Sequence, residues 1–250
     1  MDDSGCQEGK SQFVIDNPVV VPTGAKYHRE VDFSSATDYG LEFVRTYNSA
    51  WGGYGILGSS GNKWASNLDL KLSFYGTDGK VCYPSVNHDC DSYKPSFAQM
   101  AEILVHRDNG DNIVFVFDGA AMAFKSEEEP LSSLVELSDG RYRLQWPEGG
   151  YEIYRSDGVI LERRQPDGVG LIYEYDAKNR PTRMVHTSGR YISFGYDGSN
   201  YHYLTHITAP DGSVYKWGPE NVFDPVRNYS YSIGYRIEYP DGKGNKTYLY

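Results

Sequence analysis

A hairpin pattern recurs between Gly149 and Trp217, and its spacing restricts this chain to few backbone architectures. Each copy begins with aromatic residues and Asp, passes through a turn and an extended run, and ends at a second turn. The first copy contains Tyr154, Asp157, Gly158, Pro166, Asp167 and Gly168. The second contains Tyr173, Tyr175, Asp176 and the run Pro181 to Thr187. The third contains Phe194, Tyr196, Asp197, Leu204, Ile207, Pro210, Asp211 and Gly212. Residues 239–242 look like the start of another copy.

The turns in this pattern favour tight hairpins. Glycine adopts positive φ without strain, and Asp or Asn tolerates it, so Asp-Gly pairs between extended segments are typical of hairpin turns. Between the turns the side chains alternate as in half-buried strands, since Tyr142, Leu144 and Trp146 share one face. The run from Ile192 to Tyr196 alternates in the same way.

Self-similar units of roughly twenty residues predict an array in which each hairpin buries its apolar face against its neighbours. One hairpin alone would be only marginally stable. The predicted fold class is therefore all-β, an antiparallel hairpin-repeat sheet.

The run of Tyr or Phe, any residue, Tyr and Asp, then a turn with Arg, a short strand and Pro-Asp-Gly, resembles the YD repeat of the RHS family of large bacterial secreted proteins. Residues 17–27 and Leu41 to Ser49 are similar to the opening segment that precedes those repeats. Together the two resemblances cover most of residues 17–217.

This resemblance implies that the sheet is a curved segment of a larger β-shell, which encloses and delivers a variable C-terminal toxin in competition between bacteria. It also implies a secreted or cell-surface location. The self-cleaving aspartate motif that ends such shells is not found here, and neither is a toxin segment. The expected partners are the remaining repeats and the toxin of the same, longer chain.

The first complete copy departs from the family pattern after its Asp. Asn179, Arg180 and Pro181 stand where the family usually has Gly-Arg-Leu. Asn can replace Gly at positive φ, so the turn is expected to survive. Pro181 lacks a backbone donor, which predicts a strand start or an edge strand.

The charge of the chain disfavours some classes of partner. The formal net charge is -10 and the sequence pI is about 5.1. Nucleic acids and anionic membranes require clustered Lys and Arg, and the sequence contains no such cluster. No apolar stretch reaches the roughly 18 residues of a membrane span, and residues 1–20 lack the basic and apolar regions of a signal peptide.

The chain is long enough for one large all-β unit or two smaller ones. We expect a flexible leader over residues 1–16, in which Cys6 is a spare thiol, and an opening β region over residues 17–126. An acidic connection over residues 127–133 and a repeat array over 134–250 follow. The natural chain is expected to continue beyond Tyr250.

The opening region is expected to contain short strands and tight turns. Two or three strands are predicted between Val19 and Tyr47, a glycine-rich loop over 51–60, and a strand from Asn67 to Tyr75 that leads into the hairpin turn 77–79. Residues 95–100 predict one helical turn, and 102–106 should pair with 113–117. The run Ile113 to Phe117 is apolar on both faces, which predicts a fully covered strand.

Residues 82–91 concentrate potential chemistry. A metal site formed by Cys82, His88, Cys90 and carboxylates is one interpretation, but paired zinc cysteines usually lie two to four residues apart. A disulfide between Cys82 and Cys90 is favoured if the protein is exported, and the loop-entropy model gives it roughly 2.5 kcal/mol. No metal or cofactor is expected.

No residue pattern predicts catalysis. The six histidines lie in no recognisable nucleophile motif. His202 and His206 are expected on one strand face but too far apart to share a metal, so they are interpreted as surface histidines. The carboxylate pairs Asp108 with Asp111 and Asp89 with Asp91 could serve a glycosidase, but turn chemistry explains them more simply.

Tyrosine is abundant, with 23 Tyr against 10 Phe. Exposed rings could form a sugar-binding platform, or a cross-strand ladder that sets the sheet register. The ladder is favoured because the tyrosines recur with the repeat. The sequence therefore predicts a non-catalytic structural module, with a cell-surface carbohydrate-binding module as the main alternative and a glycan-processing enzyme as a weaker one.

Overall fold

The structure is a computed structural model of the whole chain. It describes residues 14–15, 19–20, 25–50, 64–82, 84, 90, 94–198, 204–224, 226, 228–240 and 244–249. Most of the predicted leader, the loop over 51–60, and His88, Asp89, Asp91 and His202 lie outside these residues. Val14 and Ile15, which belong to the predicted leader, form strand β1.

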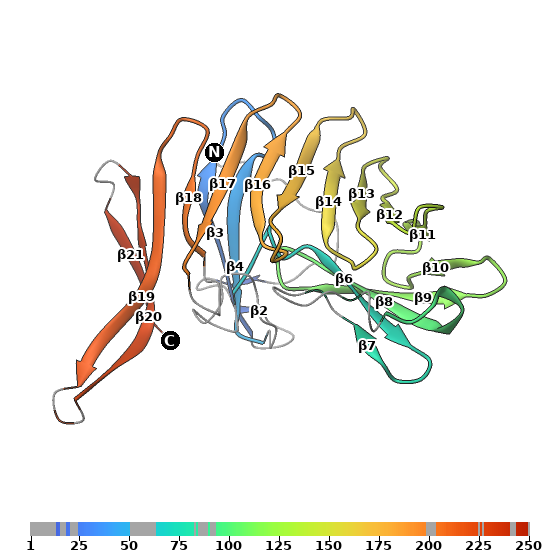
Figure 1. The fold of residues 1–250 in the computed structure, drawn as a ribbon, viewed down its shortest axis with the longest axis horizontal. Coiled ribbons are helices and arrows are strands. Elements are labelled where there is room, and N and C mark those ends of the chain that lie inside the picture. Colours follow the sequence, from blue (N-terminus) through green and yellow to red (C-terminus); the bar gives the residue numbers. More distant parts are fainter. Residues whose placement is uncertain are drawn as a thin grey trace.

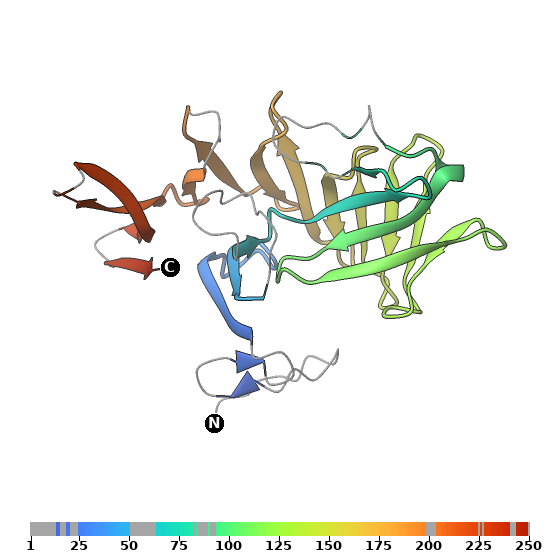
Figure 2. The ribbon, with the colours of Figure 1, turned by 90° about the horizontal axis from the view of Figure 1, so that it is seen from below.

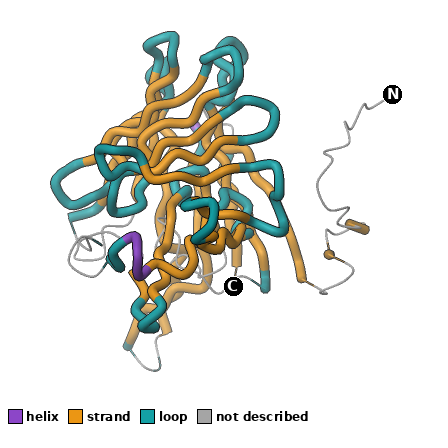
Figure 3. The backbone as a smooth tube through the Cα atoms, turned by 90° about the vertical axis from the view of Figure 1, so that its right-hand side faces the viewer, coloured by secondary structure: helices purple, strands orange, loops and turns teal. Residues whose placement is uncertain are grey.

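The described chain is almost entirely β-structure, so the predicted fold class is confirmed. One sheet contains β1 (Val14–Ile15), β2 (Val19–Val20), β3 (Ala25–Ser34), β4 (Glu42–Asn48) and β5 (Trp64–Ser66) in that order. The other is a sixteen-stranded antiparallel sheet in the order β21 to β8, then β6 and β7. The only helical element described is a 3-10 turn over Phe97–Gln99, within the predicted helical turn (Figure 3).

The large sheet is a meander in which nearly every strand pairs with its chain neighbour (Figure 1). Its first strands are β6 (Lys71–Gly76), β7 (Val81–Cys82), β8 (Met100–His106), β9 (Asn112–Asp118), β10 (Ala123–Lys125), β11 (Ser133–Glu136) and β12 (Tyr142–Gln145). The repeats contribute β13 (Tyr151–Tyr154), β14 (Ile160–Arg164), β15 (Gly170–Tyr175), β16 (Pro181–His186), β17 (Tyr191–Tyr196), β18 (Leu204–Thr208), β19 (Val214–Asp224), β20 (Tyr229–Glu238) and β21 (Asn245–Leu249).

Nine turns of this sheet share one local structure. In each, the first residue donates its N–H to the carbonyl four residues on, and the fourth residue donates its N–H to the carbonyl of the first. The fourth residue has a positive φ between 64° and 98° and is glycine except at Asn179. The turns begin at Gly76, Arg107, Leu137, Trp146, Arg155, Gln165, Asp176, His186 and Ala209. Asp-Gly pairs favour this geometry because glycine carries no Cβ penalty at positive φ.

Alternation along the strands sorts side chains onto an inner and an outer face. The inner face carries buried aromatic and aliphatic residues, as predicted for Tyr142, Leu144, Ile192 and Phe194. Pro181 is the first residue of β16, which agrees with the predicted strand start. The inner face forms the core of the molecule.

The large sheet curls so that β6 returns to the turn between β13 and β14 (Figure 2). The N–H of Leu72 donates to the carbonyl of Gly158 at 2.8 Å, and Lys71 forms an isolated antiparallel bridge with Val159. We call these two contacts the seam. A Cβ on Gly158 would lie 2.5 Å from the Leu72 oxygen, so only glycine allows this approach.

Beyond the curl, the opening segment packs on the inner face of the repeats. Strands β3 and β4 lie across β16–β18 (Figure 1), and Phe43 contacts Phe194 and Trp217 with ring centroids 6.1 Å and 5.3 Å apart. Phe33 contacts Tyr215 at 6.2 Å. The two sheets therefore share one core.

Two local predictions were wrong. The run Ile113 to Phe117 is not covered on both faces: Phe115 is buried but Val116 is 50% exposed, because the sheet is a single layer there. The strand predicted from Asn67 begins only at Lys71. Asn67 accepts from the N–H of Val44 at 3.2 Å and Asp69 accepts from the N–H of Ser66 at 2.8 Å, so side chains replace ladder bonds.

The acidic run 127–130 is a largely exposed turn between β10 and β11. Phe124 of β10 pairs with Leu134 of β11, so the sheet continues through residues 127–133. The proposed division of the chain at this point stays a prediction.

Candidate functional site

Three aromatic residues mark the repeat at intervals of 21 residues, namely Tyr154, Tyr175 and Tyr196. Each occupies the last position of its strand, directly before a turn. The strand pairing shifts register beside each of them, at Tyr154, Tyr175 and Tyr196 alike. Such β-bulges re-aim a side chain, and here the same side chain is re-aimed in every copy.

The tyrosine hydroxyl connects one copy to the copy before it. Tyr175 donates to the carbonyl of Ile160 at 2.7 Å, and Tyr196 donates to the carbonyl of Pro181 at 2.9 Å. Ile160 and Pro181 are the first residues of β14 and β16, so each hydroxyl reaches the same position of the preceding copy. We call this contact the tyrosine lock.

An arginine of the preceding copy covers each locking ring. The guanidinium of Arg155 lies 5.7 Å from the Tyr175 centroid, and that of Arg180 lies 4.9 Å from the Tyr196 centroid. This distance permits a cation–π attraction. The rings of Tyr175 and Tyr196, which recur with the repeat, are therefore covered by side chains of the adjacent copy. Such contacts between neighbouring copies are what a cross-strand ladder predicts.

A carboxylate of the same turn orients each arginine. Asp176 accepts from Arg180 Nε at 2.7 Å and from the N–H groups of Lys178 and Arg180, at 2.9 Å and 3.0 Å. Partial burial raises the pKa of Asp176, but the bonds from Arg180 outweigh it and hold the pKa below its usual value. In the earlier copy Arg155 Nε instead donates to Asp157 at 2.9 Å. The aspartate of the YD motif thus closes the turn and positions the arginine.

The aspartates that precede glycine close their turns by the same backbone bond that Asp176 accepts from Lys178. Asp157, Asp167 and Asp211 each accept the N–H two residues further on, at 3.3 Å, 2.9 Å and 2.9 Å. These bonds cap the turns that contain Gly158, Gly168 and Gly212, and Pro166 and Pro210 precede two of them. In the third copy, Asp197 begins a turn of which residues 199–203 lie outside the described chain.

Two other motif aromatics, Tyr173 and Phe194, are buried on the inner face. The imidazole ring of His206 lies against Gly195, and a Cβ on Gly195 would overlap that ring. His206 is therefore a packing residue of the outer face.

A buried ion pair crosses the curl. Glu152 on β13 is 0% exposed and accepts two bonds from Arg107, at 2.7 Å and 2.9 Å, and one from the Tyr154 hydroxyl at 2.6 Å. Arg163 approaches it at 3.4 Å. Burial raises the pKa of Glu152, but the charge of Arg107 outweighs burial and lowers the pKa to about 2. Both partners are satisfied, so the pair ties the turn after β8 to β13.

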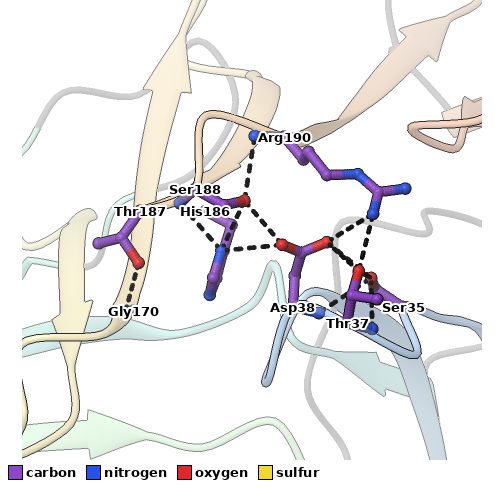
Figure 4. Close-up of polar contacts among 8 residues, drawn as sticks. All are labelled: Ser35, Thr37, Asp38, Gly170, His186, Thr187, Ser188 and Arg190. Atoms are coloured by element: carbon purple, nitrogen blue, oxygen red, sulfur yellow. Dashed lines mark hydrogen bonds and ion pairs between the residues drawn. The ribbon is translucent and has the colours of Figure 1, made fainter.

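A polar junction joins the opening segment to the repeats (Figure 4). Asp38 accepts from the Ser188 hydroxyl at 2.7 Å and pairs with Arg190 at 3.0 Å, while Arg190 also donates to the Thr37 hydroxyl at 2.8 Å. The hydrogen bond from Ser188, then that from Ser35, keeps the pKa of Asp38 below its usual value. The junction holds the turn before β4 against the turn after β16.

This junction contains Ser, His and Asp but does not have the geometry of a nucleophile. In a catalytic triad the imidazole stands between the hydroxyl and the carboxylate. Here Ser188 donates directly to Asp38, and His186 presents Nδ1 to Ser188 at 2.9 Å and to Asp38 at 3.5 Å. Its Nε2 is buried without a hydrogen-bond partner. The arrangement can hold two turns together but does not activate Ser188.

A second tether lies at the other end of the opening segment. Asp32 pairs with the buried Arg45, whose NH2 lies 3.0 Å from Oδ1, and accepts from the Tyr239 hydroxyl at 2.9 Å. Arg45 in turn lies 4.7 Å from the Trp64 centroid. Tyr239 is the residue at which a further copy was predicted to begin.

The Cα atoms of Cys82 and Cys90 lie 5.4 Å apart, within the range that disulfides require. The alternative interpretation was a metal site that includes His88, which lies outside the described residues. Within the described ranges, no cluster of three or more potential metal ligands occurs. Asn109 donates to Asp111 at 2.7 Å within a hairpin turn, and Asp108 lies 4.0 Å from Arg163. The disulfide stays a prediction.

Sequence reasoning found the turns and the recurring tyrosines but missed Glu152, Arg107, Asp38 and His186. Their partners lie 45 residues away for Glu152 with Arg107, and 150 residues away for Asp38 with Ser188. One signal was available in Glu152 itself, a charged residue two positions before the motif tyrosine Tyr154 and therefore on the same face of an extended segment.

Two family models match this chain. Residues 16–89 match a family described as a domain of unknown function, DUF6531, and residues 175–214 match the family described as RHS Repeat. The first match coincides with the opening segment, and the second covers the complete copies of the hairpin pattern. Neither description is that of a catalytic family. No curated protein matches the chain. Within the described residues no helix is both long and apolar enough to cross a membrane.

Proposed function

We propose that this chain is a non-catalytic structural module of a secreted or cell-surface RHS-repeat protein, a proposal supported by the matches over residues 175–214 and 16–89. In this proposal its curved sheet forms part of a β-shell that encloses or delivers a C-terminal toxin. The partners are then further repeats and the toxin of the same chain.

The tyrosine lock is the observation that carries the proposal. Tyr175 reaches the start of β14 and Tyr196 reaches the start of β16 by the same hydrogen bond. A contact that links each copy to the one before it can be repeated without limit, which is what the extension of a wall requires. Each lock also stiffens the sheet because the ring lies under an arginine that its own turn holds in place.

Curvature supports the same proposal. The sheet curls around an apolar core, and the opening segment covers the inner face between Met184 and Trp217. Any enclosed cargo would therefore contact other repeats and not this part of the inner face. The opening segment would close the shell on this side.

No observation on the described residues favours the carbohydrate-binding alternative. The repeat tyrosines that could stack on a sugar are covered by Arg155 and Arg180, and the exposed Tyr191 is covered by Arg183 at 4.7 Å. For the enzyme alternative, Asp111 accepts a hydrogen bond from Asn109 within its own turn, and the pair Asp89 with Asp91 lies outside the described residues.

Electron-microscopic imaging of the full-length protein tests the proposal. An enclosed cavity that contains the C-terminal segment is expected, together with protection of that segment from added protease. An extended sheet without a cavity, or a C-terminal segment cleaved as fast as a free peptide, would contradict it. Binding on a glycan array that is lost on substitution of exposed tyrosines would favour the carbohydrate-binding alternative.

A further inference from the structure

The seam that closes the curl depends on few contacts. Besides the Leu72–Gly158 hydrogen bond and the Lys71–Val159 bridge, the ion pairs Arg107–Glu152 and Arg163–Asp108 connect the turn after β8 to β13 and β14. Strand β6 is held on its other edge by β8, with which it pairs from Lys71 to Gly76. Weakening the β6–β8 pairing at Lys71 therefore weakens the seam itself.

Lys71 belongs to a row of three outer-face residues on adjacent strands. It pairs in register with His106 of β8, which pairs in register with Asn112 of β9. Directly opposed residues of antiparallel strands have Cβ atoms about 5 Å apart, so each side chain touches the next. Ser73 Oγ lies 2.6 Å from His106 Nε2 and completes the group.

Most of this group is shielded from water in part although it lies on the outer face. Ser73 is only 2% exposed, Lys71 and His106 are half-buried, and Asn112 is exposed. Burial, and then the charge of Lys71, lower the pKa of His106 to about 4, while the hydrogen bond that the imidazole donates to Asn112 opposes them. Burial also lowers the pKa of Lys71, against the attraction of Asp69. Among the described residues, these are the charged and hydrogen-bonding groups that act on the pair.

We propose that Lys71 and His106 form an acid-sensitive latch, which holds the seam closed at neutral pH and loosens it when His106 takes up a proton beside Lys71. The bond to Ser73 does not prevent this, because a hydroxyl can accept from a protonated imidazole as well as donate to a neutral one. The penalty comes from placing two adjacent cations in a partly shielded site.

The direction follows from proton linkage. When β6 separates from β8 at Lys71 and the seam opens with it, His106 leaves this site and regains its ordinary pKa of 6.5, so the open state binds a proton that the closed state rejects. The closed state is therefore fully favoured above about pH 6.5 and loses this advantage as the pH falls toward 4. With a pKa of 6.5 in the open state and about 4 in the closed state, the equilibrium constant for opening should increase about thirtyfold from about pH 7.5 to about pH 5.

Amide hydrogen exchange of the intact chain, measured on peptides that contain residues 71–76 and 100–107, tests the latch. With rates corrected for intrinsic exchange, protection in the unaltered protein should fall about thirtyfold from about pH 7.5 to about pH 5. His106→Gln should remove most of this dependence. His28→Gln is the control, because His28 is bonded to Glu30 on β3 and not to the seam.

Lys71→Met is the second variant and serves if His106→Gln does not fold. Removing the neighbouring cation should raise the pKa of His106 in the closed state, so protection should fall by a smaller factor and level off at a higher pH than in the unaltered protein. The proposal is overturned if protection at the seam does not change with pH, or if His106→Gln and Lys71→Met both keep the original profile. The measurement requires no cargo, so it stands apart from the proposed shell.

Discussion

Removing the hydroxyl of Tyr175 is the sharpest test of the tyrosine lock. Tyr175→Phe keeps the ring, and with it the contact with Arg155, but deletes the 2.7 Å bond to the Ile160 carbonyl. Ile160 is 0% exposed, so its carbonyl has little access to water as a replacement. A lost hydrogen bond that leaves a buried partner costs about 1 to 2 kcal/mol.

The same chain supplies a matched control. The hydroxyl of Tyr173 is buried two positions earlier on the same strand and has no hydrogen-bond partner. Tyr173→Phe therefore removes the same atom without deleting a bond and should leave stability unchanged or slightly raised.

Thermal unfolding followed by circular dichroism should separate the two variants. For a chain of this size each kcal/mol lowers the midpoint by about 2 to 4 °C, so Tyr175→Phe should melt about 2 to 8 °C below the unaltered protein. Equal losses for Tyr173→Phe and Tyr175→Phe would refute the lock, because the effect would then come from the ring environment and not from the bond.

Three further outcomes are expected. Gly158→Ala should lower the urea midpoint of unfolding more than Gly168→Ala. Both glycines have positive φ, but only a Cβ on Gly158 would meet the Leu72 oxygen, at 2.5 Å. The backbone strain of alanine at position 168 alone should lower the free energy of unfolding by about 1 to 2 kcal/mol. Glu152→Gln leaves Arg107 unpaired and should cost about 3 to 5 kcal/mol. Since the pKa of Glu152 is lowered from 4.5 to about 2, the stability that this carboxylate contributes is present above pH 4.5 and is lost as the pH falls toward 2, and acid titration of the Gln variant should lack that loss. A non-reduced digest should contain a peptide linked through Cys82 and Cys90, and reduction should cost roughly 2.5 kcal/mol; alkylation of both thiols without reductant would exclude the bond.

The repeat was predictable because its determinants are local. A turn such as 165–169 depends on Gly168 at φ 84° and on Asp167, which accepts the N–H of Val169. Both residues lie within the turn that they stabilise. Strand faces were predictable for the same reason, since neighbouring side chains point to opposite sides.

The predictions of strand burial and of strand start were wrong where a local sequence pattern fits two different structures equally well. Ile113 to Phe117 is apolar at every position, and a single layer or a double layer would satisfy that pattern equally. Asn67 and Asp69 read as strand residues by position, but their side chains bond to the backbone of Val44 and Ser66. Whether such bonds form depends on where β4 lies, which no local rule provides.

By itself the sequence determined the hairpins, their turns, the inward residues of the repeats and the resemblance to the RHS repeat that the match over residues 175–214 supports. Only the tertiary structure decided that Arg107 meets Glu152, that Asp38 meets Ser188, and that Asp32 meets Tyr239, 207 residues further on. The physical reason is range. Backbone torsions and turn hydrogen bonds act over a few residues, whereas a pair of charges is brought together by the curvature accumulated over many strands.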